Sequence, residues 1–398
     1  MAYRSFLIVL VLLSVGVTDQ VFAQTQPLDG PELAGITALT GDVVIGRGFG
    51  GTHKYAAAWL AIMPNGQILV AYPNPTEFEL DGRIPYVDVV DHQGNILETR
   101  AAFHDDQGNP IESRPQGLGD DTRGIVVEAS QSGESRYVCY CRLQPWYYQG
   151  PLAAWWNGTK PFEGAAGVGA GQVYAADGTA LSPLFNMWTE AQIADSGDTR
   201  ARAAAFLSNG NIAVNWWDQK VPAVGTTGDR WPGYEGTGKL VGICIVAPNG
   251  SVVLPPTPIS EPTVDGAQTM RGMAAGNGWF CCRWEQVNEG IRYKVFDNAG
   301  NLLHTIAVND AIEAVMPGVG GAAGGRGDSE LMYGRGDYLY TMGGAGGNAY
   351  IGKWNAKAGT LVKMVQASEF GGYTGERMDV CCDDSGNVFA MWADQASG

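Results

Sequence analysis

Short stretches in which apolar and polar residues alternate recur along this chain, and each is interrupted by a turn that contains glycine. The clearest copies run over 206–219, 276–286 and 384–395, where the second strand ends near a tryptophan, an acidic residue and a glutamine. Weaker copies run over 63–72, 132–141 and 333–340. Alternation with a period of two residues is typical of β-strands, and Asn-Gly-type turns join such strands into hairpins. The sequence therefore predicts six β-hairpins.

A second hairpin follows each of the first five. These outer hairpins run over 86–97, 172–181, 241–253, 292–303 and 350–362. Two hairpins in series make a four-stranded unit, which is the blade of a β-propeller. Units that repeat at such a period bury their faces against their neighbours. We predict an all-β fold, a six-bladed β-propeller of four-stranded blades, and no helix of useful length in the mature chain.

The sixth unit has a single hairpin, and a hairpin pattern without a partner lies near the N-terminus, over 35–45. We expect the N-terminal strands to complete the last blade and close the ring, because closure removes exposed sheet edges. The alternative is a truncated chain that lacks further blades.

The N-terminus has the features of a secretory signal peptide, which we assign to residues 1–23. Arg4 supplies a positive charge, an apolar stretch runs over 6–17, and Val21-Phe22-Ala23 is a small-residue cleavage site. The apolar stretch is too short to span a bilayer comfortably. We therefore expect a propeller domain over 24–398 that is secreted or periplasmic.

The net charge of −16 argues against nucleic acid as a partner, because few cations are available to neutralise phosphates. It also argues against binding to an anionic membrane surface or insertion into one. Seven cysteines in an exported chain suggest disulfides, but they lie inside strand patterns at positions where sister repeats carry alanine or valine. Buried free thiols are the favoured interpretation. Without a Cys-x-x-Cys or a histidine pair at ligand spacing, we expect no metal site and no cofactor.

The lengths of the connections distinguish the two faces of such a propeller. Turns within hairpins are short, whereas the connections over 73–85, 143–171 and 221–239 are long, and function concentrates in long loops on a rigid scaffold. These loops are rich in aromatic residues that can stack on sugar rings, namely Trp146, Tyr147, Tyr148, Trp155, Trp156, Trp231 and Tyr234. The alternative is that the loops fold into small hydrophobic clusters of their own.

Arginines near the predicted starts of the innermost strands form a second set, Arg123, Arg200, Arg271 and Arg377. Guanidinium groups at the mouth of a central channel can hold a carboxylate or sulfate in a bidentate manner. The competing interpretation is local pairing with the neighbouring acidic residues Asp120, Asp121, Asp198 and Glu376.

A third set is the repeated Trp217-Asp218, Trp284-Glu285 and Trp392-Ala-Asp394. Carboxylates that converge near a channel can act on a glycosidic bond. We favour a structural role, because catalysis needs one unique pair whereas this motif recurs from blade to blade.

The stretch over 206–217, with its Ser-Asn-Gly turn and final tryptophan, and the stretch over 293–303, with its Phe-Asp-x-x-Gly turn, resemble the propeller-type repeats of exported bacterial proteins. The resemblance implies the architecture only, because propellers host many functions. Six-bladed sialidases are a natural comparison, but the repeated Ser-x-Asp-x-Gly-x-Thr-Trp box is missing. The leading hypothesis is a secreted propeller that binds carbohydrate or another extracellular ligand. A glycan-active hydrolase or lyase and a protein-interaction scaffold are the alternatives, and whether the chain is an enzyme stays open.

Overall fold

The computed structural model describes most of the predicted strands and leaves several of the connections undescribed. The described residues are 59–72, 86–91, 94–105, 107–110, 125–130, 134–143, 168–186, 198–219, 239–260, 267–268, 272–286, 290–319, 332–345, 348–367, 379–382 and 386–391. Within these ranges the protein is nearly all β. The N-terminal hairpin predicted over 35–45 and the signal peptide lie outside them.

Antiparallel pairing groups the strands of the described residues into six sheets that follow one another along the chain. Sheet 1 contains β1 (Trp59–Ile62), β2 (Ile68–Tyr72), β3 (Tyr86–Val90) and β4 (Ile96–Ala101). Sheet 2 contains β5 (Ile125–Ala129), β6 (Arg136–Leu143), β7 (Val168–Ala175) and β8 (Phe185–Asn186). Sheet 3 contains β9 (Asp198–Phe206), β10 (Ile212–Gln219), β11 (Lys239–Val246) and β12 (Val252–Pro258).

The second half of the chain continues the pattern. In sheet 4 the first strand position is shared by β13 (Ala267–Gln268) and β14 (Met273–Gly276), followed by β15 (Trp279–Gln286), β16 (Gly290–Asp297) and β17 (Leu302–Ala307). Sheet 5 contains β18 (Met332–Arg335), β19 (Tyr338–Ala345), β20 (Asn348–Asn355) and β21 (Thr360–Gln366). Sheet 6, as far as it is described, contains β22 (Asp379–Cys382) and β23 (Val388–Met391).

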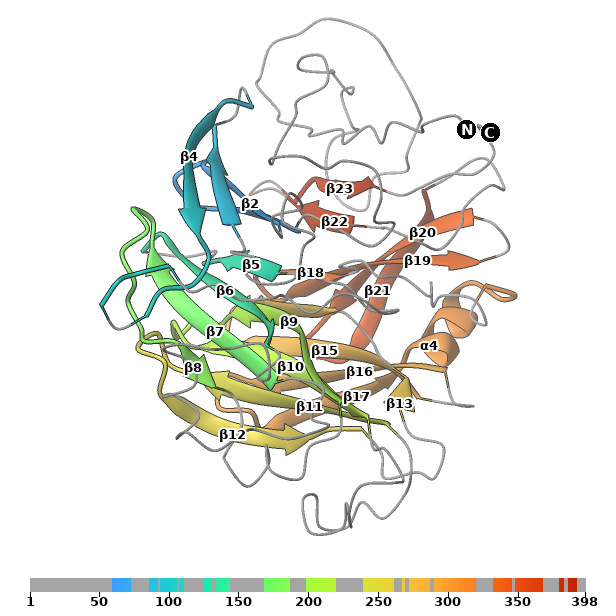
Figure 1. Ribbon diagram of the computed structural model, residues 1–398. Helices are drawn as coiled ribbons and strands as arrows, with labels where there is room; N and C mark the ends of the chain where they lie inside the picture. Colours follow the sequence, from blue (N-terminus) through green and yellow to red (C-terminus); the bar gives the residue numbers. More distant parts are fainter. Residues whose placement is uncertain are drawn as a thin grey trace, which may run out of the picture.

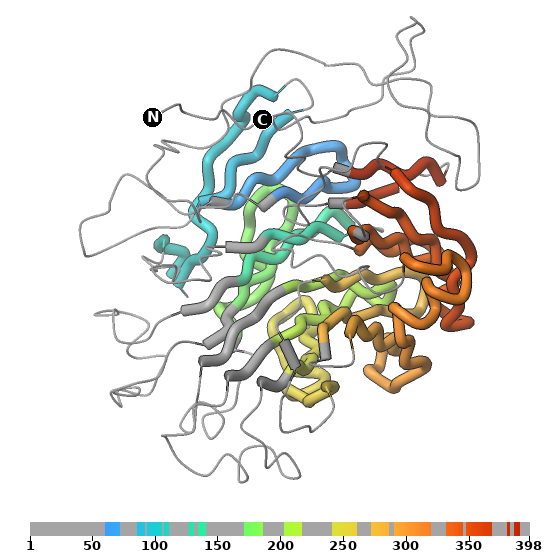
Figure 2. Tube along the Cα trace, turned by 90° about the vertical axis from the view of Figure 1, so that its right-hand side faces the viewer, coloured from blue at the N-terminus to red at the C-terminus, as the bar shows by residue number. Residues whose placement is uncertain are grey.

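The first strands of successive sheets are neighbours in space. β1 contacts β5, β5 contacts β9, β9 contacts β14, β14 contacts β18 and β18 contacts β22. Figure 1 shows the sheets in chain order from blue through green and yellow to red, and in Figure 2 the blue and red ends again lie side by side. Meandering sheets that place their first strands along a common line are arranged as the blades of a β-propeller are.

The tight turns form as their local sequence predicts. In the Asp297–Asn301 turn, the side chain of Asp297 accepts a hydrogen bond from the backbone N–H of Asn301 at 2.9 Å and another from its side-chain amide at 2.8 Å. Gly300 has a φ of 88°, a left-handed conformation that favours glycine. The same Asp-x-x-Gly-Asn turn recurs at 91–95 and 105–109, so one local solution serves several hairpins.

The core consists of two large clusters of buried apolar residues, one spanning sheets 1 to 3 and one spanning sheets 3 to 6. Sheet 3 is buried on both faces. Along β9, Ala203 and Ala205 belong to the second cluster, whereas Ala204 and Phe206 belong to the first. Successive side chains of a strand point to opposite faces, so sheet 3 lies between the two clusters.

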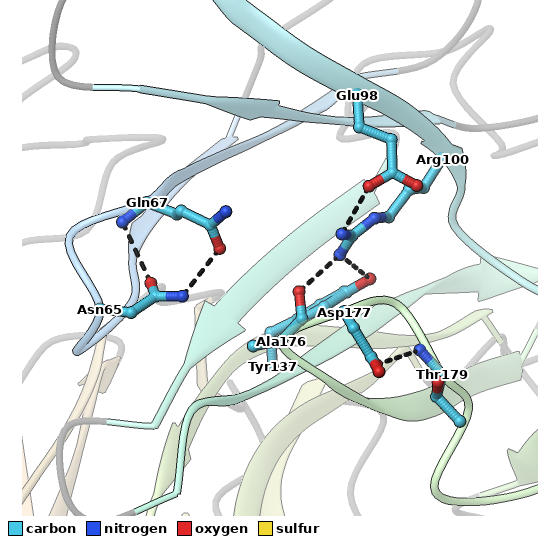
Figure 3. Close-up of polar contacts among 8 residues, drawn as sticks. All are labelled: Asn65, Gln67, Glu98, Arg100, Tyr137, Ala176, Asp177 and Thr179. Carbon is cyan, nitrogen blue, oxygen red and sulfur yellow. Dashed lines mark hydrogen bonds and ion pairs between the residues drawn. The ribbon is translucent and has the colours of Figure 1, made fainter.

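The outer parts of the sheets are joined by a recurring contact in which the outer hairpin turn of one sheet lies against the outermost strand of the sheet before it. A Cβ atom on the turn glycine would lie within 3.3 Å of that strand in four successive junctions, which pair Gly178 with Arg100, Gly250 with Phe185, Gly300 with Leu254, and Gly359 with His304. Figure 3 shows the first of these contacts, where Arg100 Nη1 donates to the carbonyl of Ala176 at 2.9 Å. The geometry therefore repeats while the chemistry of the contact changes.

One prediction is wrong. The structure contains a helix, α4 (Val308–Val315), in the connection from sheet 4 to sheet 5. Val308 and Ile312, one helical turn apart, are its buried residues, a pattern too short to stand out among the strand patterns. None of the helices in the described residues is long and apolar enough to cross a membrane.

Candidate functional site

Each sheet has two different ends. At the turn end, short hairpins join the first strand to the second and the third to the fourth. At the other, which we call the loop end, the second strand leads to the third. In sheet 3, Gln219 at the end of β10 pairs with Asp198 at the start of β9 and with Lys239 at the start of β11. The starts of the first strands and the long connections therefore share the loop end, as the sequence predicts.

The predicted aromatic residues lie outside the described residues. They are Trp146, Tyr147, Tyr148, Trp155, Trp156, Trp231 and Tyr234. The structure does fix the points where the chain leaves and re-enters the sheets around them. Leu143 pairs with Val168 across β6 and β7, and Gln219 pairs with Lys239 across β10 and β11. Both aromatic-bearing segments thus begin and end at the loop end of neighbouring sheets.

Of the predicted arginines, Arg200 lies in β9, where its backbone pairs with that of Trp217, and its side chain is not among those described. Arg123, Arg271 and Arg377 lie outside the described residues. Each precedes by two residues the start of a first strand, namely β5 at Ile125, β14 at Met273 and β22 at Asp379. In sequence, each of the four arginines thus lies within two residues of the start of a first strand.

Two of the first strands are irregular close to arginine positions. In sheet 3, Asn215 pairs with Ala203 and Trp216 with Ala201, so Arg202 is an extra residue. In sheet 4, Gln268 pairs with Glu285 and Met273 with Cys282. The four residues 269–272, which include Arg271, are therefore matched by only two residues of β15. Bulges are over-represented beside active sites, where they redirect a side chain.

In the repeated tryptophan-acidic motif, the tryptophan has a structural role in sheet 4, where its side chain is described. The Trp284 side chain is fully buried in the core, and Lys294 Nζ lies 5.4 Å from its ring centroid. The side chains of Trp217 and Asp218 are not described, and Trp392 and Asp394 lie outside the described residues. For sheet 4, the interpretation of this tryptophan as a packing residue is confirmed.

A polar cluster that the sequence did not reveal joins sheets 1 and 2. The hydroxyl of Tyr174 on β7 lies 2.6 Å from Gln172 Oε1, 2.8 Å from the carbonyl of Ala102 and 3.1 Å from His104 Nδ1. Gln172 is also bonded to the backbone of His104 on both sides, accepting from its N–H at 2.8 Å and donating to its carbonyl at 3.1 Å. The Gln-x-Tyr spacing, which places both side chains on one face of β7, was a sequence signal for half of this cluster. No sequence signal indicated His104, which lies about 70 residues earlier in the chain.

Burial governs the protonation of this cluster. It lowers the pKa of His104, against an opposing effect of the nearby Asp105, and the imidazole is therefore mostly neutral at pH 7. Burial raises the pKa of Tyr174 strongly, with smaller contributions from Cys139 and Tyr137. The Tyr174 hydroxyl consequently keeps its proton at any physiological pH.

The cysteines agree with the prediction of buried free thiols, with one exception. Among the described side chains, Cys139, Cys244, Cys281, Cys282 and Cys382 are buried and Cys381 is exposed, and none of these six is in a disulfide. Burial raises the pKa of Cys244 to about 12, so this thiol is protonated and poorly nucleophilic at neutral pH. Cys381 lies on β22, the first strand of sheet 6. It departs from the prediction because the core cluster that buries Cys382 does not cover the side chain of Cys381.

A small cavity lies between α4 and sheets 4 and 5. Its wall is formed by Tyr293, Ile312, Val319, Thr341, Met342, Gly343, Tyr350 and Met364. Tyr293 is fully buried, and its pKa is raised by burial and opposed by the nearby charge of the buried Arg283. Its small size, with room for about a single water molecule, makes this cavity part of the packing. No cluster of three or more potential metal ligands occurs among the described residues.

No protein-family model and no curated protein sequence matches the chain. Among solved structures it is similar to the polysaccharide lyase Uly1, with a TM-score of 0.47 at 10% identity over 86% of this chain and 74% of the other. It is also similar to the Hadza microbial sialidase Hz136 (TM-score 0.42, 11% identity, 85% and 63%) and to the β-propeller domain of the Trilobed protease from Pyrococcus furiosus (0.42, 10%, 84% and 78%). None of these likenesses reaches a TM-score of 0.5, so the architecture rests on the sheet order and the contacts between sheets.

Proposed function

We propose that this chain is a secreted or periplasmic β-propeller binding protein that recognises carbohydrate, or another extracellular ligand, through the aromatic-rich segments at its loop end. The observation that carries the proposal is the pairing of Leu143 with Val168 and of Gln219 with Lys239. It roots residues 144–167 and 220–238 at the same end of two neighbouring sheets. The eight aromatic residues of these two segments can present flat surfaces to the C–H faces of a sugar.

The architecture that goes with this function is a closed ring of six blades. We propose that the hairpin over 35–45 pairs with the free edge of β23 and completes sheet 6. Two observations support this arrangement. Sheets 1 to 5 each provide four strand positions, whereas sheet 6 provides two in its described part. The blue and red ends of the sheet series also lie side by side in Figures 1 and 2.

A glycan array tests the binding function directly. The mature chain, 24–398, should bind at least one class of glycan, and a variant with Trp155→Ala and Trp156→Ala should lose that binding. The matched control is Tyr338→Ala, because Tyr338 is an exposed aromatic residue at the turn end, 38% accessible. Loss of binding in the control, or its persistence in the double variant, would contradict the proposal.

A glycan-active hydrolase or lyase is the second candidate, and the irregular first strands of sheets 3 and 4 favour it. Both irregularities fall at or beside arginines near the loop end, and a guanidinium group is well suited to hold the carboxylate or sulfate of an acidic sugar. Cleavage of acidic polysaccharides, followed by the release of new chain ends, would distinguish this activity from binding alone. Arg200→Ala and Arg271→Ala should then lose turnover.

A protein-interaction scaffold is favoured by a different feature. The outermost strands of several sheets carry exposed aliphatic residues within their first three positions, which are Ile96, Leu97, Val252, Val253, Leu302, Leu303 and Val362. Exposed apolar residues that gather in patches mark contact surfaces for other proteins. The double variant Leu302→Ser with Leu303→Ser changes only the turn end. If this variant still binds sugar, the exposed aliphatic residues are not part of the proposed sugar-binding function.

A further inference from the structure

Three hairpin turns in the described residues share one backbone geometry around an Asn-Gly pair. They run over 63–67, 207–211 and 247–251. In each, the glycine N–H donates to the carbonyl of the first residue at 2.8 or 2.9 Å, and the glycine has a φ between 83° and 85°. The asparagine Oδ1 accepts a hydrogen bond from the backbone N–H two residues further on, at 3.1 Å in all three turns. The backbone around these asparagines is therefore the same.

Side-chain contacts distinguish the first of these turns from the third, both of which carry Pro-Asn-Gly. In the first, Asn65 Nδ2 donates to Gln67 Oε1 at 2.8 Å (Figure 3). In the third, the hydroxyl of Ser251 donates to Asn249 Oδ1 at 2.8 Å, in addition to the Ser251 N–H at 3.1 Å. Asn249 Oδ1 thus accepts from two donors of one residue, whereas at Asn65 the amide nitrogen is engaged as a donor.

An asparagine that is followed by glycine is open to attack on its own side chain. The backbone nitrogen of the glycine bonds to Cγ of the asparagine, and the absence of a glycine side chain leaves the approach clear. The nitrogen loses its proton to a solvent base, the Cγ–Nδ2 bond breaks, and Nδ2 takes a proton from solvent and leaves as ammonia. Water then opens the resulting succinimide ring at either carbonyl, which gives aspartate or isoaspartate.

The contacts of Asn249 favour this reaction and those of Asn65 oppose it. The attack moves negative charge onto Oδ1, and preorganised donors at about 2.7–3.1 Å from a developing oxyanion stabilise it. The N–H and the hydroxyl of Ser251 are two such donors to Asn249. At Asn65, the hydrogen bond from Nδ2 to Gln67 belongs to the intact amide and is lost when ammonia leaves.

The packing of the two glycines has the opposite effect. A Cβ on Gly66 would have nothing within 4 Å, whereas a Cβ on Gly250 would lie 3.3 Å from Phe185 and Ser182. Attack requires the hydrogen bond of the glycine N–H to open, and this opening is harder in a turn that lies against sheet 2. The relative rates at the two asparagines therefore show whether donors or packing control the reaction.

We propose that Asn249 is a site of self-catalysed deamidation, in which Ser251 stabilises the oxyanion that forms on Oδ1. The product carries an added negative charge, and its isoaspartate form also has one more methylene group in the backbone of the turn. Because this turn lies against Phe185 of β8, the isoaspartate form loosens the junction between sheets 2 and 3. The modification requires no ligand and is independent of the function proposed above.

Peptide mass spectrometry of the chain incubated at pH 8 and 37 °C measures the reaction, because the exchange of an amide for a carboxyl group changes the peptide mass. Asn249 should convert several-fold faster than Asn65. Ser251→Ala keeps the backbone donor and removes the hydroxyl, and Ser251 is exposed, so the variant should fold as the wild type does. It should slow conversion at Asn249 several-fold and leave Asn65 and Asn209 unchanged.

Gln67→Ser is the matched converse variant. It releases Nδ2 of Asn65 and places a hydroxyl where Ser251 stands in the third turn, so Asn65 should convert faster than in the wild type. Faster conversion at Asn65 than at Asn249 in the wild type, or equal rates at Asn249 with and without Ser251→Ala, would overturn the proposal. An effect of Ser251→Ala that is equally large in denaturant would also overturn it, because the contact in the folded turn would then not be the cause.

Discussion

The junction between sheets 1 and 2 and the junction between sheets 4 and 5 solve the same packing problem with different chemistry. The first is fastened by side chains that reach across it, with Arg100 bonded to Ala176 and His104 bonded to Gln172. The second is fastened by close backbone approach, since a Cβ on Gly334 would lie 2.1 Å from the carbonyl oxygen of Ala275. A repeated architecture therefore does not imply equal strength or equal response to conditions at each junction.

The difference follows from what each junction buries. Between sheets 4 and 5, the fully buried Trp354 meets the ring of Tyr293 edge-on at 5.4 Å, and Trp279 Nε1 donates to the carbonyl of Gly336 at 2.8 Å. This packing depends on volume, and the polar contact of the same junction, between His304 Nε2 and the carbonyl of Lys357 at 2.6 Å, lies at its exposed outer edge. Between sheets 1 and 2, the contacts are polar and partly accessible, so charge and protonation can alter them.

The largest effect is expected from Trp354→Ala in the apolar junction. Removing a buried tryptophan costs about 3–5 kcal/mol of unfolding free energy, because apolar contacts are lost and a cavity remains. Denaturant unfolding measures this. Trp354→Phe keeps most of the volume and loses the 2.9 Å hydrogen bond to Thr341, so its loss should be clearly smaller. Equal losses would mean that the hydrogen bond, not the packing, holds this junction.

Gly334→Ala tests the close backbone approach in the same junction. The added methyl group meets backbone atoms of Ala275, which cannot rotate away, so overpacking should cost about 1–3 kcal/mol. A matched substitution is Gly272→Ala, whose nearest neighbour would be the flexible side chain of Met332, 3.0 Å away. Thermal unfolding should show the larger loss for Gly334→Ala, and the reverse order would argue against close strand approach as the fastening.

In the polar junction, Arg100→Met should cost less, about 1–2 kcal/mol. The variant keeps the apolar stem and removes the charged donor to the Ala176 carbonyl. Glu98→Gln, which removes the ion pair of a half-exposed carboxylate, should cost below about 1 kcal/mol. The two variants together separate the contact that crosses the junction in Figure 3 from the one that stays within β4.

The smallest effect is expected from pH. The pKa of His104 is lowered in the folded state, so between that value and the ordinary 6.5 the unfolded chain binds more protons. Stability should therefore fall as the pH drops through 6.5, with a slope below one proton, and His104→Asn should remove this part of the dependence. Unfolding free energies at pH 7.5 and pH 5.5 check the sign. The prediction would be contradicted if the wild type, but not His104→Asn, were more stable at pH 5.5 than at pH 7.5.

The parts of the fold that depend only on residues close together in the sequence were predictable from it. The Gly300 turn and the hairpins around it follow from the preference of glycine for positive φ and from alternating apolar positions. The bulge at Arg202 was not predictable, because it exists only in the register between β9 and β10. His104 and Tyr174 meet across a junction between sheets, and nothing local in either segment indicates the other. The predicted ligand-binding aromatic residues stay a prediction.

Sheet 3 has a consequence for how the chain behaves as a whole. In an array of stacked units, cooperativity is set by the weakest interface between neighbours, and a chain with a poor interface melts in pieces. Because β9 alternates its side chains between the two core clusters, damage to either cluster is transmitted to the same strand. Sheets 1 and 2 and sheets 5 and 6, whose described residues share no cluster, are thereby thermodynamically coupled through a unit that belongs to both clusters.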